Sequence, residues 1–165
     1  HVAESEKYAH VTYFFNAGTE KAFTGEDRIV VPSPKVLSYD QVPQMSTTEV
    51  AEAVIKGLEK YDFIILNFAA PDMVGHTGNL RAAIVACEAV DEALKNIYEA
   101  MDKQNGLLIV TADHGNVEQM VNPKTGEPDT EHSNNPVPLY LIGEAVKGWN
   151  IRAGSLSDLA PTILG

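Results

Sequence analysis

The sequence contains a single cysteine, Cys87, and no apolar run close to the ~20 residues that a membrane-spanning helix requires. A lone cysteine excludes an internal disulfide and favours a reducing compartment, the cytoplasm. Because Cys87 falls within a helical pattern, we expect a buried and unreactive thiol. Nothing near the start resembles a signal peptide. These absences predict a cytoplasmic protein without a membrane segment.

Basic residues are also scarce, since 12 lysines and arginines face 23 aspartates and glutamates, for a net charge of −11. This charge argues against nonspecific nucleic-acid binding and against an anionic membrane surface. It suits an anionic substrate only if metal ions supply positive charge or basic residues lie outside this chain, and we expect both. No G-x-x-x-x-G-K-S/T or G-x-G-x-x-G pattern occurs, so nucleotide binding is unsupported.

The length of 165 residues and the hydrophobic content of 44% predict one globular domain, residues 1–165. Short apolar runs bounded by Gly, Pro, Asn or Asp predict strands at 10–15, 28–32, 63–69, 107–113 and 137–143. The runs at 63–69 and 107–113 are apolar almost throughout, which is typical of central parallel strands covered on both faces. Helical patterns separate them, so we expect an α/β fold with three layers, a mostly parallel central sheet and helices on both faces.

Two helices are predicted in detail, at 45–61 and at about 79–104. Ser46 with Glu49 three residues later predicts a capping box at the start of the first. Asn105-Gly106 predicts the end of the second. The stretch 121–138, rich in Gly, Pro, Asn and Thr, is predicted to be a long functional loop.

Five side chains that can bind metal follow or precede these apolar runs. Asp72 and His76 lie in PDMVGHTG, Asp113 and His114 in TADHGN, and His132 in EHSNNPVP. Carboxylate and imidazole together suit Mn, Zn or Fe better than Ca. Strand carboxyl ends meet at one edge of an open α/β sheet, where ligands bind. Five ligands exceed what one ion needs, so the pattern predicts a paired-metal site for phosphoryl chemistry.

Each segment taken alone also has an ordinary explanation. Asp72 fits a helix-capping carboxylate beside a surface His76, and Asp113 fits a turn residue with His114 adjacent by chance. His132 fits a loop histidine with satisfied hydrogen bonds. Lys7 is either an exposed lysine on a short helix or a charge for a phosphoryl oxygen, and the spacing does not decide between them.

The stretches AESEKYAHVTYFFNAG, GEDRIVVPSPKV, YDFIILNFAAPDMVGHTG, TADHGNVEQM, EHSNNPVP and SDLAPTILG resemble, in order, the metalloenzyme half of cofactor-independent phosphoglycerate mutases. This family lies within the alkaline phosphatase superfamily. The resemblance implies two divalent ions, most often Mn²⁺, with no need for 2,3-bisphosphoglycerate. It also implies interconversion of 3-phosphoglycerate and 2-phosphoglycerate through a phosphoserine.

The resemblance assigns a role to each candidate residue. Asp72, His76 and His132 look like the ligands of one ion, and Asp113 with His114 like ligands of the other. Lys7 matches a catalytic lysine beside the phosphoryl group.

The family's nucleophilic serine, a further aspartate ligand and the inserted substrate-binding domain match nothing in this sequence. We therefore expect a C-terminal part of the enzyme that is inactive by itself. The full-length enzyme is expected to be monomeric, whereas the part should expose a sheet edge or an apolar patch and tend to self-associate.

Two other hypotheses stay open. One is a different activity of the alkaline phosphatase type, such as a phosphopentomutase or a phosphatase. The other is a noncatalytic module that binds metal or a partner.

Overall fold

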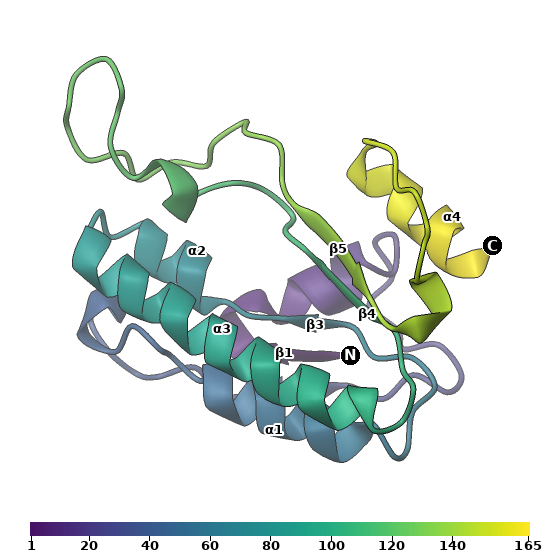
Figure 1. Cartoon of the computed structure of the whole chain (residues 1–165). Coiled ribbons are helices and arrows are strands. Elements are labelled where there is room, and N and C mark those ends of the chain that lie inside the picture. Colours follow the sequence, from purple (N-terminus) through teal and green to yellow (C-terminus); the bar gives the residue numbers. More distant parts are fainter.

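The computed structural model describes residues 1–165 and has a short parallel sheet at its centre (Figure 1). Strand β1 (Val2–Glu4) lies between β2 (Ile29–Val31) and β3 (Leu66–Asn67), and both neighbours run parallel to it. In the register, Val2 pairs with Ile29 on one side and with Leu66 on the other. The predicted strands at 28–32 and 63–69 are therefore present in shorter form, whereas β1 had not been predicted.

A second, two-stranded sheet pairs β4 (Leu108–Thr111) with β5 (Leu139–Ile142) in antiparallel orientation. Both strands were predicted, but the expected role of 107–113 as a central parallel strand was wrong. Leu108, Ile109 and Val110 are only half-buried and Thr111 is exposed. An apolar run alone does not reveal how many faces of a strand are covered, which explains the error.

Helices α1 (Thr47–Gly57) and α3 (Leu80–Asp102) pack against each other and cover one side of the strands (Figure 1). Their contact forms the main core, in which Val50, Val54 and Ile97 are 0%, 2% and 2% exposed. Burying side chains of this size stabilises by ~1.5–3 kcal/mol each. The helix predicted at 79–104 is confirmed, and the Asn79 side chain accepts the Ala82 amide as its N-cap.

The short helix α2 (Ala70–Gly75) packs closely on the first turns of α3. The residues between them are small, namely Ala69, Ala70, Val74, Ala82, Ala83 and Ala86. Such side chains let two helices approach closely, so α2 is held against α3 where it follows β3.

The predicted strand at 10–15 is wrong, because His10–Phe14 forms a π-helix (η2) on the side of the strands opposite α1 (Figure 1). The Thr12 hydroxyl donates to the Tyr8 carbonyl one turn earlier, and the Asn16 amide donates to the Thr12 carbonyl. The run HVTYFF is rich in β-branched and aromatic residues, and a short run of that kind does not distinguish a strand from a buried helix.

Two details of the helices also differ from the prediction. Ser46 does not form a capping box, since its hydroxyl donates to Pro32 and its amide donates to the buried Glu4 carboxylate at 3.1 Å. Cys87 is exposed on α3, because alanines fill the face of the helix that packs inward.

The remaining elements are short. They are the 3₁₀ helices η1 (Ser5–Lys7), η3 (Tyr39–Gln41), η4 (Val117–Gln119), η5 (Glu144–Val146) and η6 (Leu156–Asp158), and the helix α4 (Leu159–Leu164). The stretch 121–138 is a loop, as predicted, with only an isolated bridge at Val121 and Pro128 and another between Gly115 and Ser133. None of the helices combines the length and the apolar character that crossing a membrane demands.

Candidate metal centre

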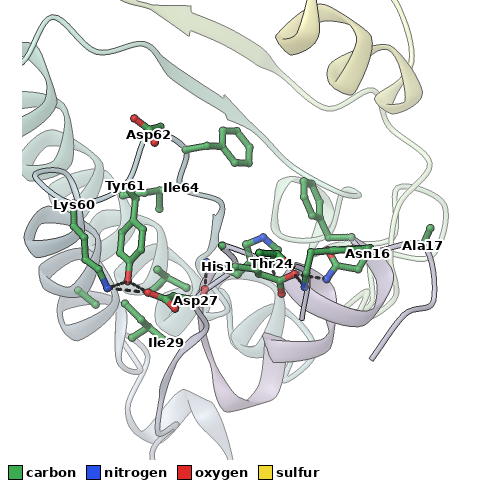
Figure 2. A pocket seen from close by; sticks show the side chains of 18 residues that line it. His1, Asn16, Ala17, Thr24, Asp27, Ile29, Lys60, Tyr61, Asp62 and Ile64 are labelled. Atoms are coloured by element: carbon green, nitrogen blue, oxygen red, sulfur yellow. Dashed lines mark hydrogen bonds and ion pairs between the residues drawn. The ribbon is translucent and has the colours of Figure 1, made fainter. Parts of the chain in front are cut away.

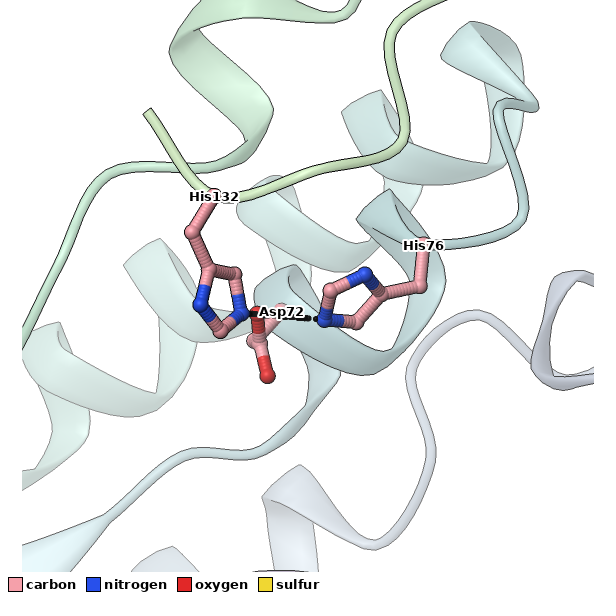
Figure 3. A group of neighbouring side chains, drawn as sticks. All are labelled: Asp72, His76 and His132. Atoms are coloured by element: carbon pink, nitrogen blue, oxygen red, sulfur yellow. Dashed lines mark hydrogen bonds and ion pairs between the residues drawn. The ribbon is translucent and has the colours of Figure 1, made fainter. Parts of the chain in front are cut away.

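Two segments that are distant in sequence meet beyond the carboxyl ends of the parallel strands. Strand β3 leads into α2, which carries Asp72, and His76 follows at the end of the same helix. The loop between η4 and β5 carries His132 across to them (Figure 3). The predicted meeting of these side chains at one edge of the sheet is therefore found in the structure.

The ligand atoms of Asp72, His76 and His132 all lie within 4.8 Å of one another. The Nε2 atom of His132 is 3.0 Å from Oδ1 of Asp72 and 3.0 Å from Nε2 of His76. Nε2 of His76 is 3.2 Å from the same Asp72 oxygen. Two imidazole nitrogens and one carboxylate oxygen that converge in this way could provide three ligands to one divalent ion.

A backbone carbonyl sets the orientation of the His76 ring. Nδ1 of His76 lies 2.7 Å from the carbonyl oxygen of Thr130, to which it can donate. With the proton on Nδ1, the lone pair of Nε2 faces Asp72 and His132. Metal-binding histidines are characteristically held by such a bond from the other ring nitrogen.

Asp72 is fixed as a carboxylate by two buried donors. Nζ of Lys7, a residue only 6% exposed, is 2.5 Å from Oδ2, and Nδ2 of Asn116 is 2.8 Å from Oδ1. Burial opposes ionisation, but the hydrogen bonds from Lys7 and Asn116 outweigh it and lower the pKa of Asp72 to about 2. The Asp72 carboxylate consequently stays ionised to a lower pH than an ordinary aspartate does.

His114 and Asp113 lie at the rim of this cluster rather than inside it. The His114 ring stacks on His132, with centroids 3.7 Å apart, and its Nε2 is 4.0 Å from Oδ1 of Asp72. Asp113 approaches Nε2 of His114 at 3.5 Å and is half-exposed. The structure thus brings the predicted second pair beside the first three residues without completing a second set of three.

Several residues that organise the centre were not predicted from the sequence. Asn116 binds Asp72, and Glu118 binds the loop next to His132 through Ser133 and Asn135. All four lie within the motifs TADHGNVEQM and EHSNNPVP, so proximity to the ligands was the only available signal. Their contacts join segments that no local periodicity relates.

A hollow of about 770 Å³ lies at the other end of the sheet (Figure 2). It lies where the strands begin, and its lining includes Val2, Ile29 and Ile64. Several of its polar groups are paired with one another, as where Asp27 accepts from Lys60 at 2.8 Å and from the Tyr61 hydroxyl at 2.5 Å. It contains no member of the metal cluster, so convergence of donors rather than volume identifies the site.

Known proteins of one family are similar to this chain. The Metalloenzyme superfamily matches residues 1–165. The 2,3-bisphosphoglycerate-independent phosphoglycerate mutase of Moorella thermoacetica is 56% identical over 163 residues, which cover 99% of this chain and 32% of the relative. The enzyme of the same name from Chloroflexus aurantiacus is 51% identical over 170 residues, again 99% of this chain and 32% of the relative.

A solved structure is also similar. The crystal structure of Leishmania mexicana phosphoglycerate mutase at low cobalt concentration matches with a TM-score of 0.81 and 37% identity. The match covers 88% of this chain and 30% of that chain. The chain therefore spans about a third of the length of the relatives that it matches.

Proposed function

This chain belongs to the metalloenzyme superfamily, and we propose that it is the metal-binding part of a 2,3-bisphosphoglycerate-independent phosphoglycerate mutase. The reaction would interconvert 3-phosphoglycerate and 2-phosphoglycerate, an isomerisation by phosphoryl transfer. The observation that carries the proposal is the convergence of Asp72, His76 and His132 in a chain more than half identical to named mutases. The exposed single thiol, Cys87, supports a reducing cytoplasm as the compartment.

Two divalent ions, with Mn²⁺ preferred, would occupy the centre. Asp72, His76 and His132 would hold one ion, and Asp113 with His114 would contribute to the other. The nitrogen and oxygen donors suit Mn²⁺, and cobalt in the name of the similar mutase structure also supports a divalent ion. When bound, such ions supply positive charge to phosphoryl oxygens and lower the pKa of a coordinated hydroxyl.

Lys7 would act as a fixed positive charge beside the transferred phosphoryl group. Its ammonium is buried and held against Asp72, so it is placed at the ligand cluster rather than in solvent. A positive charge preorganised in a buried position stabilises an anionic transition state more than one in water. Its effect would add to that of the ions in a chain whose net charge is −11.

The nucleophilic serine of the proposed phosphoserine step would come from outside these 165 residues. Ser133, next to His132 in sequence, has its hydroxyl engaged by the Glu118 carboxylate. Glu118 is a weak base, since the Ser133 and Asn135 hydrogen bonds outweigh its partial burial and lower the pKa of its carboxyl. The 165 residues alone would then bind metal but not turn over phosphoglycerate.

Calorimetric titration of Mn²⁺ into this chain near pH 8 tests the metal site. We expect about one equivalent in the tighter class of sites, lost in His132→Ala, because affinity depends on ligand number and geometry. His1→Gln, which alters an imidazole at the opposite end of the sheet, is the control and should bind as the parent does. Binding that survives His132→Ala unchanged would reject the site.

A second experiment tests the substrate. The full-length protein should convert 3-phosphoglycerate without 2,3-bisphosphoglycerate, and Asp72→Ala should abolish that turnover. Preference for pentose phosphates would instead identify a phosphopentomutase. Turnover that is unchanged in Asp72→Ala would instead support the hypothesis that this chain is a noncatalytic metal-binding module.

Exposed apolar side chains support self-association of the isolated chain, whereas the full-length enzyme would be monomeric. Large apolar residues with at least 44% exposure include Phe23, Leu107, Tyr140, Trp149 and Leu156. A monomer mass in light scattering across a wide concentration range would contradict the association of the isolated chain.

A further inference from the structure

His132 is a ligand carried by a long loop, and its position needs an explanation. The neighbours of its Nε2 atom are Asp72 and His76, each about 3.0 Å away. When both Nε2 atoms are unprotonated, as metal binding requires, they are two neutral acceptors that repel each other at that distance, and His132 has no proton there to donate to Asp72. The loop 121–138 contains no helix or strand of its own. Contacts elsewhere in the loop must therefore hold His132 at the cluster.

Those contacts converge on the side chain of Glu118. One carboxylate oxygen accepts the backbone amide of Asn116 at 2.6 Å. The other accepts hydrogen bonds from the Ser133 hydroxyl and from the side-chain amide of Asn135, the latter at 3.0 Å. A single carboxylate thus joins Asn116, which follows the His114 segment, to Ser133 and Asn135, which follow His132 in the loop.

The backbone reinforces this connection at Gly115. Its carbonyl accepts the Ser133 amide at 2.9 Å, which forms an isolated antiparallel bridge between the two segments. A Cβ atom at Gly115 would collide with Ser133 Oγ and Glu118 Oε1. Only a glycine leaves room for the loop at this distance.

We propose that Glu118 is a positioning residue that holds the His132 loop against the ligand cluster. The inference rests on the proposed metal-binding function but assigns a role to a residue that coordinates nothing. The hydrogen bonds of Glu118 reach residues that adjoin the proposed ligands. Ser133 follows His132 in sequence, and the side chain of Asn116 donates to Asp72. Loss of the carboxylate should therefore release His132 while Asp72 and His76, on one helical turn, keep their places.

The first test needs no metal. Because His132 stacks on His114 at 3.7 Å, the ring protons of His132 should show shifted NMR resonances from the neighbouring ring current. In Glu118→Ala these resonances should move toward the positions of an unstructured histidine, with Glu118→Gln intermediate because it still accepts hydrogen bonds. Glu131→Gln removes an exposed negative charge directly beside His132 and should leave the resonances in place.

The second test is a double-mutant cycle on Mn²⁺ affinity. Glu118→Ala should weaken binding about 10- to 100-fold, the range typical of groups that orient metal ligands. In a His132→Ala background, where Asp72 and His76 leave only weak residual binding, the same change should not weaken that residual binding further, because the ligand it positions is already gone. Asn135→Ala, which removes one donor only, should weaken binding less and provides a milder variant if Glu118→Ala unfolds.

The outcomes separate this inference from the proposed function. His132 resonances that do not move in Glu118→Ala would overturn the positioning role, as would an equal loss of Mn²⁺ affinity with and without His132. Resonances that move in a chain that binds no Mn²⁺ would support the role of Glu118 and reject the metal site.

Discussion

Each end of the parallel sheet has an aspartate paired with a lysine, yet the two aspartates differ in their burial and in the groups that face their second carboxylate oxygen. At the end where the strands begin, Asp27 is paired with Lys60 and Tyr61 and is exposed. At the end where they finish, Asp72 is paired with Lys7 and both are largely buried. The first pair is typical of a solvated surface, where such bridges contribute little.

The difference lies in the second oxygen of the buried carboxylate. Oδ1 of Asp72 faces nitrogen atoms of His76 and His132, neither of which brings a fixed positive charge. No comparable set of three metal-type ligands surrounds Asp27, although a hollow of about 770 Å³ is at that end. Converging donors that lack a fixed counter-charge therefore indicate a metal site better than hollow volume does.

Asp72→Ala should have the largest effect and Asp27→Ala a small one. The first change leaves the buried Lys7 without a partner, and the free energy of unfolding should fall by about 3–5 kcal/mol. It should also abolish Mn²⁺ binding, which Asp27→Ala should preserve. Denaturant unfolding and calorimetry check both, and equal losses in the two variants would remove the distinction between the ends.

Addition of Mn²⁺ should stabilise the folded chain only through the cluster at the carboxyl ends of the parallel strands. At about 100 times its Kd, an ion that binds only the folded state raises the free energy of unfolding by about 2.7 kcal/mol. Thermal unfolding should show the rise, and a chelator should reverse it. His132→Ala should lose the response and Lys60→Met should keep it. A stabilisation that His132→Ala retains would indicate binding elsewhere.

Glu4→Gln and Glu26→Gln should change stability in opposite directions. Glu4, the last residue of β1, is fully buried and one of its carboxylate oxygens has no hydrogen-bond partner. The free energy of unfolding of Glu4→Gln at pH 8 should therefore exceed that of the parent by about 1 kcal/mol. Glu26, at the other end, accepts from Asn16, Arg28 and the Phe23 amide, so loss of its charge should destabilise the fold. Denaturant unfolding of both variants measures the signs.

The pH dependence of the Glu4 effect follows from its pKa. Burial raises the pKa of Glu4 above 4.5, so the folded state holds this proton more tightly than the unfolded chain. Stability from this group is present at low pH and is lost as pH rises through the folded pKa. The gain from Glu4→Gln should accordingly be larger at pH 8 than at pH 4, and a pH-independent gain would contradict this account.

Gly115→Ala and Gly25→Ala should give modest effects, again on different properties. A methyl group at Gly115 would push Ser133 and Glu118 away, which should weaken Mn²⁺ binding about tenfold. Gly25 has open space around it but a φ of +85°, so alanine there should cost about 1 kcal/mol of stability without altering Mn²⁺ affinity. A Gly115→Ala chain that binds Mn²⁺ normally would show that the loop can adjust.

The long helix and the turn that carries Asp72 and His76 could be predicted because their signals are local. The Asn79 cap, the Asn105-Gly106 end and the helical period lie within α3 itself. The π-helix at His10–Phe14 and the antiparallel pairing of β4 could not, because both depend on which segments cover an apolar run. Strand β1, only three residues long, offers too short a pattern to recognise.

The sequence by itself determined the chemical types of the donors and the pairs that are close along the chain. Asp72 and His76 share one helical turn, and Asp113 precedes His114 directly, so covalent spacing limits their separation. Tertiary structure alone decided that His132 and Lys7, 60 and 65 residues from Asp72, would reach it. Those contacts depend on hydrogen bonds and packing between distant segments, such as those of Glu118 with the loop, and no local pattern encodes them.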